Sequence, residues 1–218
     1  MGRAVWGRLI WLGVFAIAMG LLEGICVIYL RRLLPVDGGA HVVPAVLNHV
    51  EVIREACTVV MLVCIAWLSG VSALSRVTCF FYAFGIWDIV YYAGLSWLAG
   101  WPTSILEWDC LFLIPKAWHG PVLAPVLISL YFVGWCLWAH DREIRGRPLR
   151  VSAVVIGTQL LAFLVWYGSF VKDSDWIRAH RGSYGGVSYS WGLFALGAVI
   201  GSVGLWWASR RAPPGRKM

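Results

Sequence analysis

The chain has 218 residues, of which 60% are hydrophobic and only 13% charged, with a formal net charge of +7. Soluble domains carry about 25% charged residues, so this composition excludes a water-soluble globule. The basic residues form short clusters beside apolar runs, where membrane topology explains them, so we predict no nucleic-acid partner.

Six apolar runs follow one another along the chain, each close to the roughly 20 residues that a helix needs to cross a bilayer. The runs lack the alternation of barrel strands, which leaves helices as the only spanning structure that satisfies the backbone. We therefore predict an all-α polytopic membrane protein, a bundle of six transmembrane helices in a single transmembrane domain (1–218) with a basic cytoplasmic tail (209–218). The predicted spans are residues 9–30, 50–70, 78–99, 122–139, 151–170 and 190–208.

The lysines and arginines near the span ends predict the orientation of the chain. With the N-terminus inside, eleven of the 18 basic residues lie on the inner side, six lie on the outer side, and Arg54 lies within a span. This distribution predicts that both termini are cytoplasmic.

Two further sequence features concern the packing of the spans. Gly20-x-x-x-Gly24 and Gly197-x-x-x-Gly201 offer flat helix surfaces, which we expect to pack against other helices of the same chain rather than form a dimer. Six cysteines lie mostly within apolar runs and are typical of buried filler, although Cys26, Cys57 and Cys110 approach one membrane face and leave a disulfide open there.

The connection between the third and fourth spans contains a capping box, Ser104-x-x-Glu107, shortly after Pro102. This pattern predicts a short helix that ends before Pro115. The segment is too short to cross a bilayer and too apolar to lie in water, so we expect a re-entrant or interfacial helix.

Ionisable residues within the spans are costly and mark candidate functional positions. From the helical rise of 1.5 Å per residue, Glu23 and Glu55 lie about 10 Å below the outer edge and Asp88 lies roughly 15 Å deep. In the second span, Glu51, Arg54, Glu55 and Thr58 follow helical spacing and form one polar stripe. These three carboxylates, each on a different span, predict one cavity that opens toward the outer face of the membrane.

We assign candidate roles from this pattern. Carboxylates in a low-dielectric setting suit acid/base catalysis, and the predicted catalytic residues are Glu23, Glu55, Asp88 and Asp109. The predicted substrate-binding residues are Arg54, Glu51, Tyr91, Tyr92 and His119, and either tyrosine can also donate a hydrogen bond to Asp88. Candidate metal ligands are His49 and His119.

Structural alternatives stand beside these roles. Glu51 follows Asn48 at capping distance and can serve only as a helix cap. Glu107 is typical of a cap rather than a catalyst. Arg54 can serve only as the counter-ion that makes Glu23 or Glu55 tolerable. The sequence contains no histidine-box, zincin, nucleophile-elbow or nucleotide-loop motif, which disfavours those enzyme classes.

Residues 85–125 contain the segments GIWDIVYY, GWPTSILEWDCLFLIP and GPVLAP. This pattern resembles a group of bacterial polytopic inner-membrane proteins of uncharacterised activity. The resemblance implies that Asp88 and the Trp108-Asp109 pair belong to a recurring pattern, and we predict a bacterial inner-membrane location as in that group. It implies no activity, cofactor or partner.

Three functions fit these observations. The first is a polar site in the outer half of the bilayer that acts on a lipidic or amphiphilic substrate or binds a metal. The second is a proton- or ion-coupled transporter that uses the same acids as a relay. The third is a non-catalytic subunit, in which ion pairs fix the helix register and the partners are other subunits as well as the lipid bilayer. The sequence identifies no cofactor.

Overall fold

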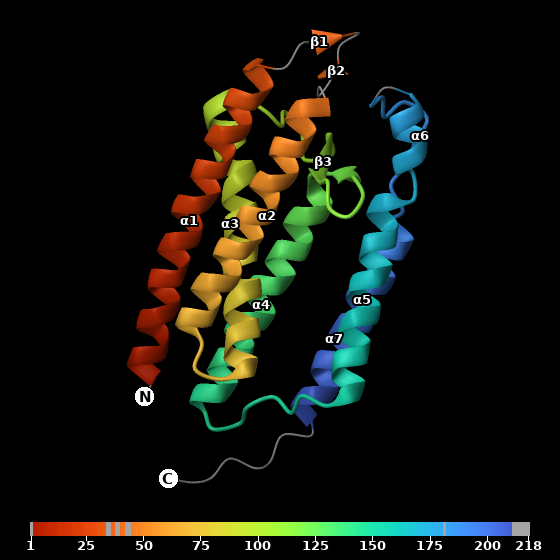
Figure 1. Cartoon of the computed structure of the whole chain (residues 1–218). Helices are drawn as coiled ribbons and strands as arrows, with labels where there is room; N and C mark the ends of the chain where they lie inside the picture. The colour runs from red at the N-terminus through yellow and green to blue at the C-terminus, as the bar shows by residue number, and fades with distance from the viewer. Residues whose placement is uncertain (1, 34–35, 38–39, 42–44, 181, 211–218) are drawn as a thin grey trace.

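The computed structural model describes residues 2–33, 36–37, 40–41, 45–180 and 182–210, and consists almost entirely of helices (Figure 1). Two connections between helices contain a short β-hairpin. In the first, β1 (Val36–Asp37) pairs with β2 (Ala40–His41), and in the second, β3 (Trp108–Phe112) pairs with β4 (Trp118–Pro121). The helices are α1 (Gly2–Leu33), α2 (Ala45–Ser69), α3 (Ala73–Ala99), α4 (Leu123–Ile144), α5 (Ala153–Val171), α6 (Ser174–Ala179) and α7 (Trp191–Arg210).

Six helices of the described chain are long and apolar enough to cross a membrane: α1 to α5 and α7. Each overlaps one of the predicted spans, so the sequence-based prediction of a six-helix membrane bundle is confirmed. The helices extend beyond the predicted spans at most ends because polar flanking residues, which hydropathy excludes, continue the helical hydrogen bonding. Of the predicted basic tail, residues 211–218 lie outside the described residues.

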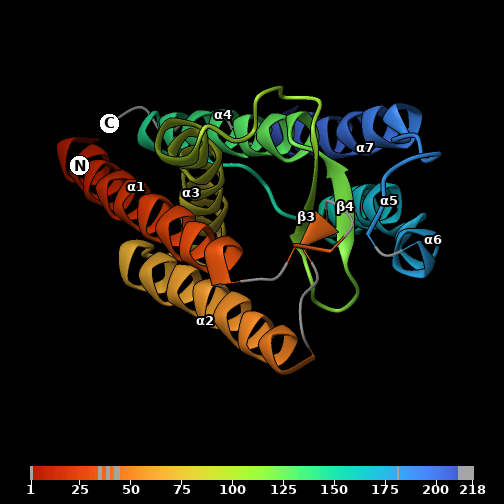
Figure 2. The same cartoon turned by 90° about the horizontal axis from the view of Figure 1, so that it is seen from above.

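The helices form two groups that meet at α4. Helix α3 packs against α1, α2 and α4, while α5 packs against α7, as seen from above in Figure 2. The aromatic residues Tyr131 and Phe132 of α4 contact Trp166 of α5, with ring centroids 5.5 and 6.0 Å apart. The contact between the groups is therefore built from large rings rather than from close backbone packing.

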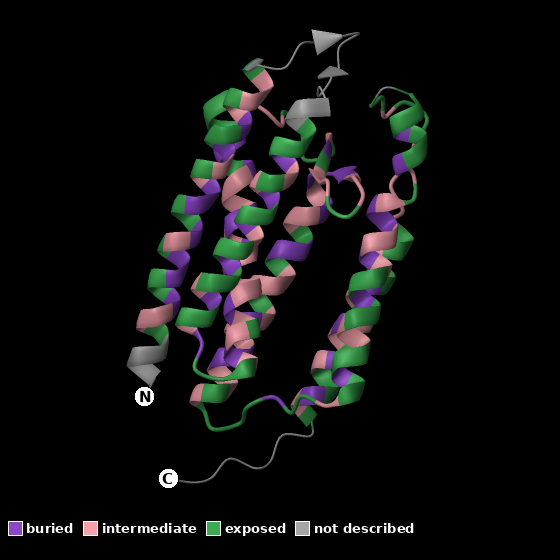
Figure 3. Ribbon diagram, in the orientation of Figure 1, coloured by how far each residue is buried: buried purple, intermediate pink, exposed green. Residues whose placement is uncertain are grey.

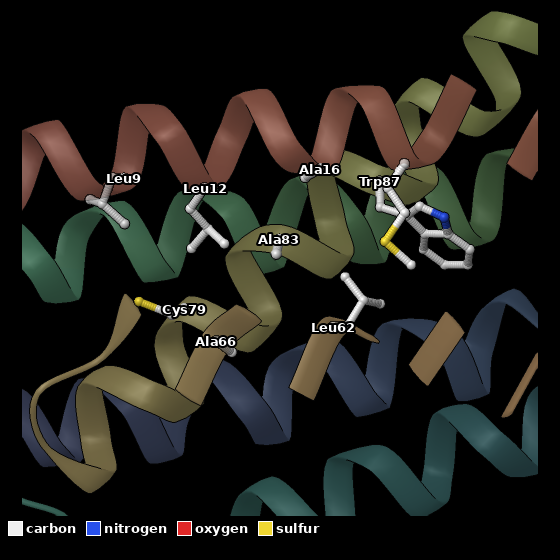
Figure 4. Packing of buried hydrophobic residues seen from close by; sticks show 9 residues of the cluster. Leu9, Leu12, Ala16, Leu62, Ala66, Cys79, Ala83 and Trp87 are labelled. Atoms are coloured by element: carbon white, nitrogen blue, oxygen red, sulfur yellow. The ribbon is translucent and has the colours of Figure 1, made fainter. Parts of the chain in front are cut away.

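The core of the first group is formed by small and branched side chains from α1, α2 and α3. Leu12, Leu62, Ala83 and Trp87 are buried there and lie together in Figure 4. Exposed side chains lie on the outer faces of the helices (Figure 3). In a soluble protein such an apolar exterior would be unstable, whereas here it matches the lipid that a spanning helix faces.

Glycines set the closest helix contacts. A Cβ atom added to Gly20 would lie 2.6 Å from the backbone oxygen of Trp87, and one added to Gly197 would lie 2.6 Å from the Trp166 ring. Both glycine motifs thus pack within the chain, as predicted. All six cysteines are free, so the disulfide left open between Cys26, Cys57 and Cys110 is not formed.

The predicted short helix between the third and fourth spans is wrong, because this segment forms the β3–β4 hairpin. Ser104 and Glu107 do make local contacts, but with other partners than a capping box requires: Ser104 accepts a hydrogen bond from the Leu106 amide at 3.2 Å, and Glu107 accepts from Thr103. They close a turn instead of starting a helix.

The chain after this turn forms β3, which pairs with the next strand, β4. Trp108 pairs with Pro121 and Asp109 with Gly120, in antiparallel register. The hairpin also packs against the helices, since Phe112 stacks against Phe84 with ring centroids 6.4 Å apart. A tertiary contact of this kind overrides the local helix signal, which is worth only about 1 kcal/mol.

Candidate functional site

The buried acidic residues lie at the end of the bundle that carries the β3–β4 hairpin, which we call the hairpin end. The opposite end, where α1 begins and α7 ends (Figure 1), we call the terminal end. Four groups of contacts build the candidate site, and each of them joins an α-helix to a segment far away in the sequence.

The first group is an ion-pair triad of Glu23, Glu51 and Arg54. Arg54 donates from Nη2 and Nε to Glu51 Oε2, at 2.8 and 3.0 Å, and also pairs with Glu23 of α1. Thr58, one turn further along α2, donates to Glu23 Oε2 at 3.3 Å. The triad thus ties α2 to α1 and leaves the Arg54 guanidinium engaged on both sides.

The second group surrounds Asp109 of β3, which is buried. Arg31 at the end of α1 pairs with Asp109 Oδ1 at 3.3 Å, and the Tyr92 hydroxyl of α3 donates to Oδ2 at 3.1 Å. The Arg31 guanidinium also lies 3.8 Å from the ring centre of Trp101, in a cation–π contact. The carboxylate therefore joins the hairpin to α1 and α3.

Burial has the largest effect on the pKa of Asp109. It raises the pKa of this carboxyl to about 6, although the Arg31 charge, the Tyr92 hydrogen bond and the Cys110 backbone amide each act to lower it. A carboxyl group with a pKa in this range changes its protonation near neutral pH, as general acid/base catalysis requires.

The third group ties the tip of the hairpin to helices on both sides. Glu55 Oε2 accepts a hydrogen bond from the Leu113 amide at 2.9 Å. On the other side, Lys116 pairs with Asp175 of α6 at 2.7 Å, and Ser174 donates to the Ala117 carbonyl at 2.5 Å. The tip therefore bridges α2 and α6, consistent with its place between α2 and α5 in Figure 2.

The fourth group is a carboxylate deep in the bundle. Asp88 of α3 is buried and accepts a hydrogen bond from Ser129 of α4 at 2.8 Å. We expected a tyrosine of α3 to donate to Asp88, and for Tyr92 this is wrong. The Tyr92 hydroxyl donates to Asp109 of β3, which packs against α3, rather than to Asp88, which lies one turn away on the same helix.

The two predicted metal ligands lie in different surroundings. His119 of β4 contacts Tyr184, with Nδ1 3.3 Å from the hydroxyl, and burial lowers the pKa of its imidazole. His49 is exposed near the start of α2. Within the part of the chain that the structure describes, no three His, Cys, Asp or Glu side chains gather in a way that could hold a metal ion.

The structure brings the predicted acidic residues into one region of the bundle, where each has partners of its own. Glu23, Glu55 and Asp88 belong to three separate groups of contacts. The polar stripe on α2 does face protein, since Glu51, Glu55 and Thr58 are buried. Glu51 takes part in the triad rather than capping, because α2 begins at Ala45, before Asn48.

Sequence reasoning missed three partners in the site. Arg31 was counted only as a topological charge, although its position directly after an apolar span was the available signal. Ser129 and Trp101 carried no signal, because a serine in a span and a tryptophan at its edge are common in membrane helices.

Comparison with models of known protein families, with curated proteins and with solved structures finds no match to this chain.

Proposed function

We propose that this integral membrane protein carries an acid/base site at its hairpin end, which acts on the polar headgroup of a lipidic or amphiphilic substrate. The observation that carries the proposal is Asp109, a buried carboxyl with a pKa of about 6, held between Arg31 and Tyr92. Its protonation changes near neutral pH, and its two partners fix the direction of its oxygens.

The surroundings of Asp109 support an amphiphilic substrate. Arg31 is the cation that would contact an anionic headgroup, because its side chain is 28% exposed, while Arg54 is engaged by two carboxylates. The tip of the hairpin, held by Glu55, lies between α2 and α5, and its release would open a path from the lipid. Glu55 would then be free to act as a second acid or base.

The proposed location is a bacterial inner membrane, with both termini in the cytoplasm and the hairpin end facing outward. The excess of arginines at the terminal end supports this orientation. Membership of the bacterial group that residues 85–125 resemble is part of the same proposal.

Lipid mass spectrometry tests the proposed activity. We expect membranes that contain the wild-type protein to gain or lose a lipid species relative to membranes that contain Asp109→Asn at equal abundance. Glu107→Gln is the matched control, since it removes a half-buried carboxylate whose contacts close a turn with Thr103. Identical lipid profiles for the wild type and Asp109→Asn would contradict the proposal.

A second candidate is proton- or ion-coupled transport, favoured by Asp88. This carboxylate lies deep in a spanning helix and accepts a hydrogen bond from the Ser129 hydroxyl, a neutral donor, which suits reversible protonation. Substrate-driven proton uptake in proteoliposomes that is lost in Asp88→Asn and kept in Asp109→Asn would favour transport over the lipid site.

The triad favours the remaining candidate, a non-catalytic subunit. Its one cation pairs with a carboxylate of α1 and with one of α2, as expected for side chains that fix helix register. A stoichiometric partner that copurifies in mild detergent, together with an unchanged lipid profile, would support this function.

A further inference from the structure

A groove of about 370 Å³ lies at the terminal end, between the start of α1 and the end of α2. The two helices run antiparallel, so Arg8 lies level with Ser69 and Leu12 lies level with Ile65. The groove is therefore polar at its outer edge and apolar one helical turn deeper. This is the order in which a phospholipid presents its headgroup and its acyl chains.

The side chains of the groove fit a lipid better than a protein core. Trp11 and Leu68, which line it, are 74% and 79% exposed. Gly7 also lines it, and a Cβ atom added there would meet no atom within 4 Å. The groove thus offers an open, apolar channel whose walls face the membrane.

The charge at the edge of the groove is Arg8. Among the side chains that the structure describes, none forms an ion pair with Arg8. Other arginines of this end are engaged: Arg76 stacks on Trp67 at 3.7 Å, and Arg145 pairs with Asp141 at 2.8 Å. A partly buried guanidinium next to an apolar channel is complementary to a phosphate that carries acyl chains.

We propose that the groove between α1 and α2 binds one anionic phospholipid, with its phosphate on Arg8 and Ser69 and an acyl chain along Trp11, Leu12 and Ile65. This site is at the opposite end of the bundle from Asp109 and is independent of the proposed acid/base activity. The bound lipid seals α1 against α2 where the triad at the hairpin end does not reach.

Native mass spectrometry of the purified full chain, titrated with dioleoyl phosphatidylglycerol or dioleoyl phosphatidylcholine, tests the site. We expect one phosphatidylglycerol to bind at least fivefold more tightly than phosphatidylcholine. Arg8→Gln should weaken phosphatidylglycerol binding about fivefold to tenfold and phosphatidylcholine binding less, because the choline cation already offsets the phosphate charge. Gly7→Leu should weaken both lipids, because its side chain fills the groove.

Arg147→Gln is the matched control, since it removes an equal charge at an exposed position of the same end that does not line the groove. Its phosphatidylglycerol affinity should stay within twofold of the wild type. An unchanged affinity in Arg8→Gln, or an equal loss in Arg147→Gln, would overturn the site. Equally tight binding of glycerol phosphate, which lacks acyl chains, would overturn the lipid as its ligand.

Discussion

At the scale of single residues, the charged side chains of the hairpin end form ion pairs, and each pair has different partners. Arg54 is shared between Glu23 and Glu51, whereas Asp109 divides its oxygens between Arg31 and Tyr92. Because these pairs are taken out of water, removing one partner leaves an uncompensated charge, which costs more than the pair contributes.

The Arg54 triad therefore predicts a large effect of a single substitution. We expect Arg54→Gln to lower the free energy of unfolding by about 3 kcal/mol, because two carboxylates stay behind without a cation. Arg145→Gln, which breaks the exposed pair with Asp141, should cost less than about 1 kcal/mol. Equilibrium unfolding in mixed micelles measures both, and equal losses would show that the triad is not a buried interaction.

Asp109 predicts a pH dependence of stability. Burial raises its pKa from 3.8 to about 6, so the folded protein holds this proton more tightly than the unfolded chain. The resulting stability is present below pH 4 and is lost as the pH rises through 6, a change of about 3 kcal/mol. We expect Asp109→Asn to flatten the fall in melting temperature between pH 4 and pH 6.

The partners of Asp109 provide the control for this pH dependence. Both Arg31 and the Tyr92 hydroxyl lower the pKa of Asp109, so Arg31→Gln and Tyr92→Phe should move the fall in stability to higher pH. A shift to lower pH in either variant would contradict the assignment of the transition to this carboxyl.

At the scale of elements, α3 is the helix on which the fold is organised. It packs against three other helices, and Gly20 of α1 and Gly85 of α3 supply the flat surfaces where two of them meet. The same contacts place Asp88 beside Ser129, so the deep carboxylate depends on the close approach of α3 and α4.

This dependence predicts the effect of adding one methyl group. In Gly85→Ala the new Cβ atom would lie 2.6 Å from the Ser129 carbonyl oxygen and 2.9 Å from Val133, so α3 and α4 must separate. We expect a loss of about 1–3 kcal/mol in the free energy of unfolding. Gly134→Ala on α4, where the added atom meets nothing within 4 Å, should cause no loss and a gain of up to about 1 kcal/mol from helix propensity.

At the scale of the whole molecule, charge is distributed unevenly between the two ends. Buried carboxylates gather at the hairpin end, while Arg8, Arg76 and Arg142 lie at the terminal end, where Arg76 stacks on the exposed Trp67 and Arg142 lies over the half-buried Trp138. Guanidinium and indole groups of this kind favour the headgroup region of a bilayer.

The charge distribution predicts the orientation, which cysteine labelling measures. In a background without native cysteines, Ser104→Cys at the hairpin end should react with a membrane-impermeant maleimide added to intact cells. Arg147→Cys at the terminal end should react only after permeabilisation. Both positions are exposed, so access to reagent rather than burial decides the result. The reverse pattern would contradict a cytoplasmic location of the termini.

The sequence by itself determined the class of the protein, the six helices and the polar stripe of α2. These depend on local properties, since about 20 apolar residues suffice to define a span and helical spacing places Glu51, Glu55 and Thr58 on one face. Only the tertiary structure decided the hairpin and the partners of the acids. Arg31 and Asp109 are 78 residues apart, and Glu55 meets Leu113 across 58 residues. Such pairs depend on how distant elements pack, which no local pattern records.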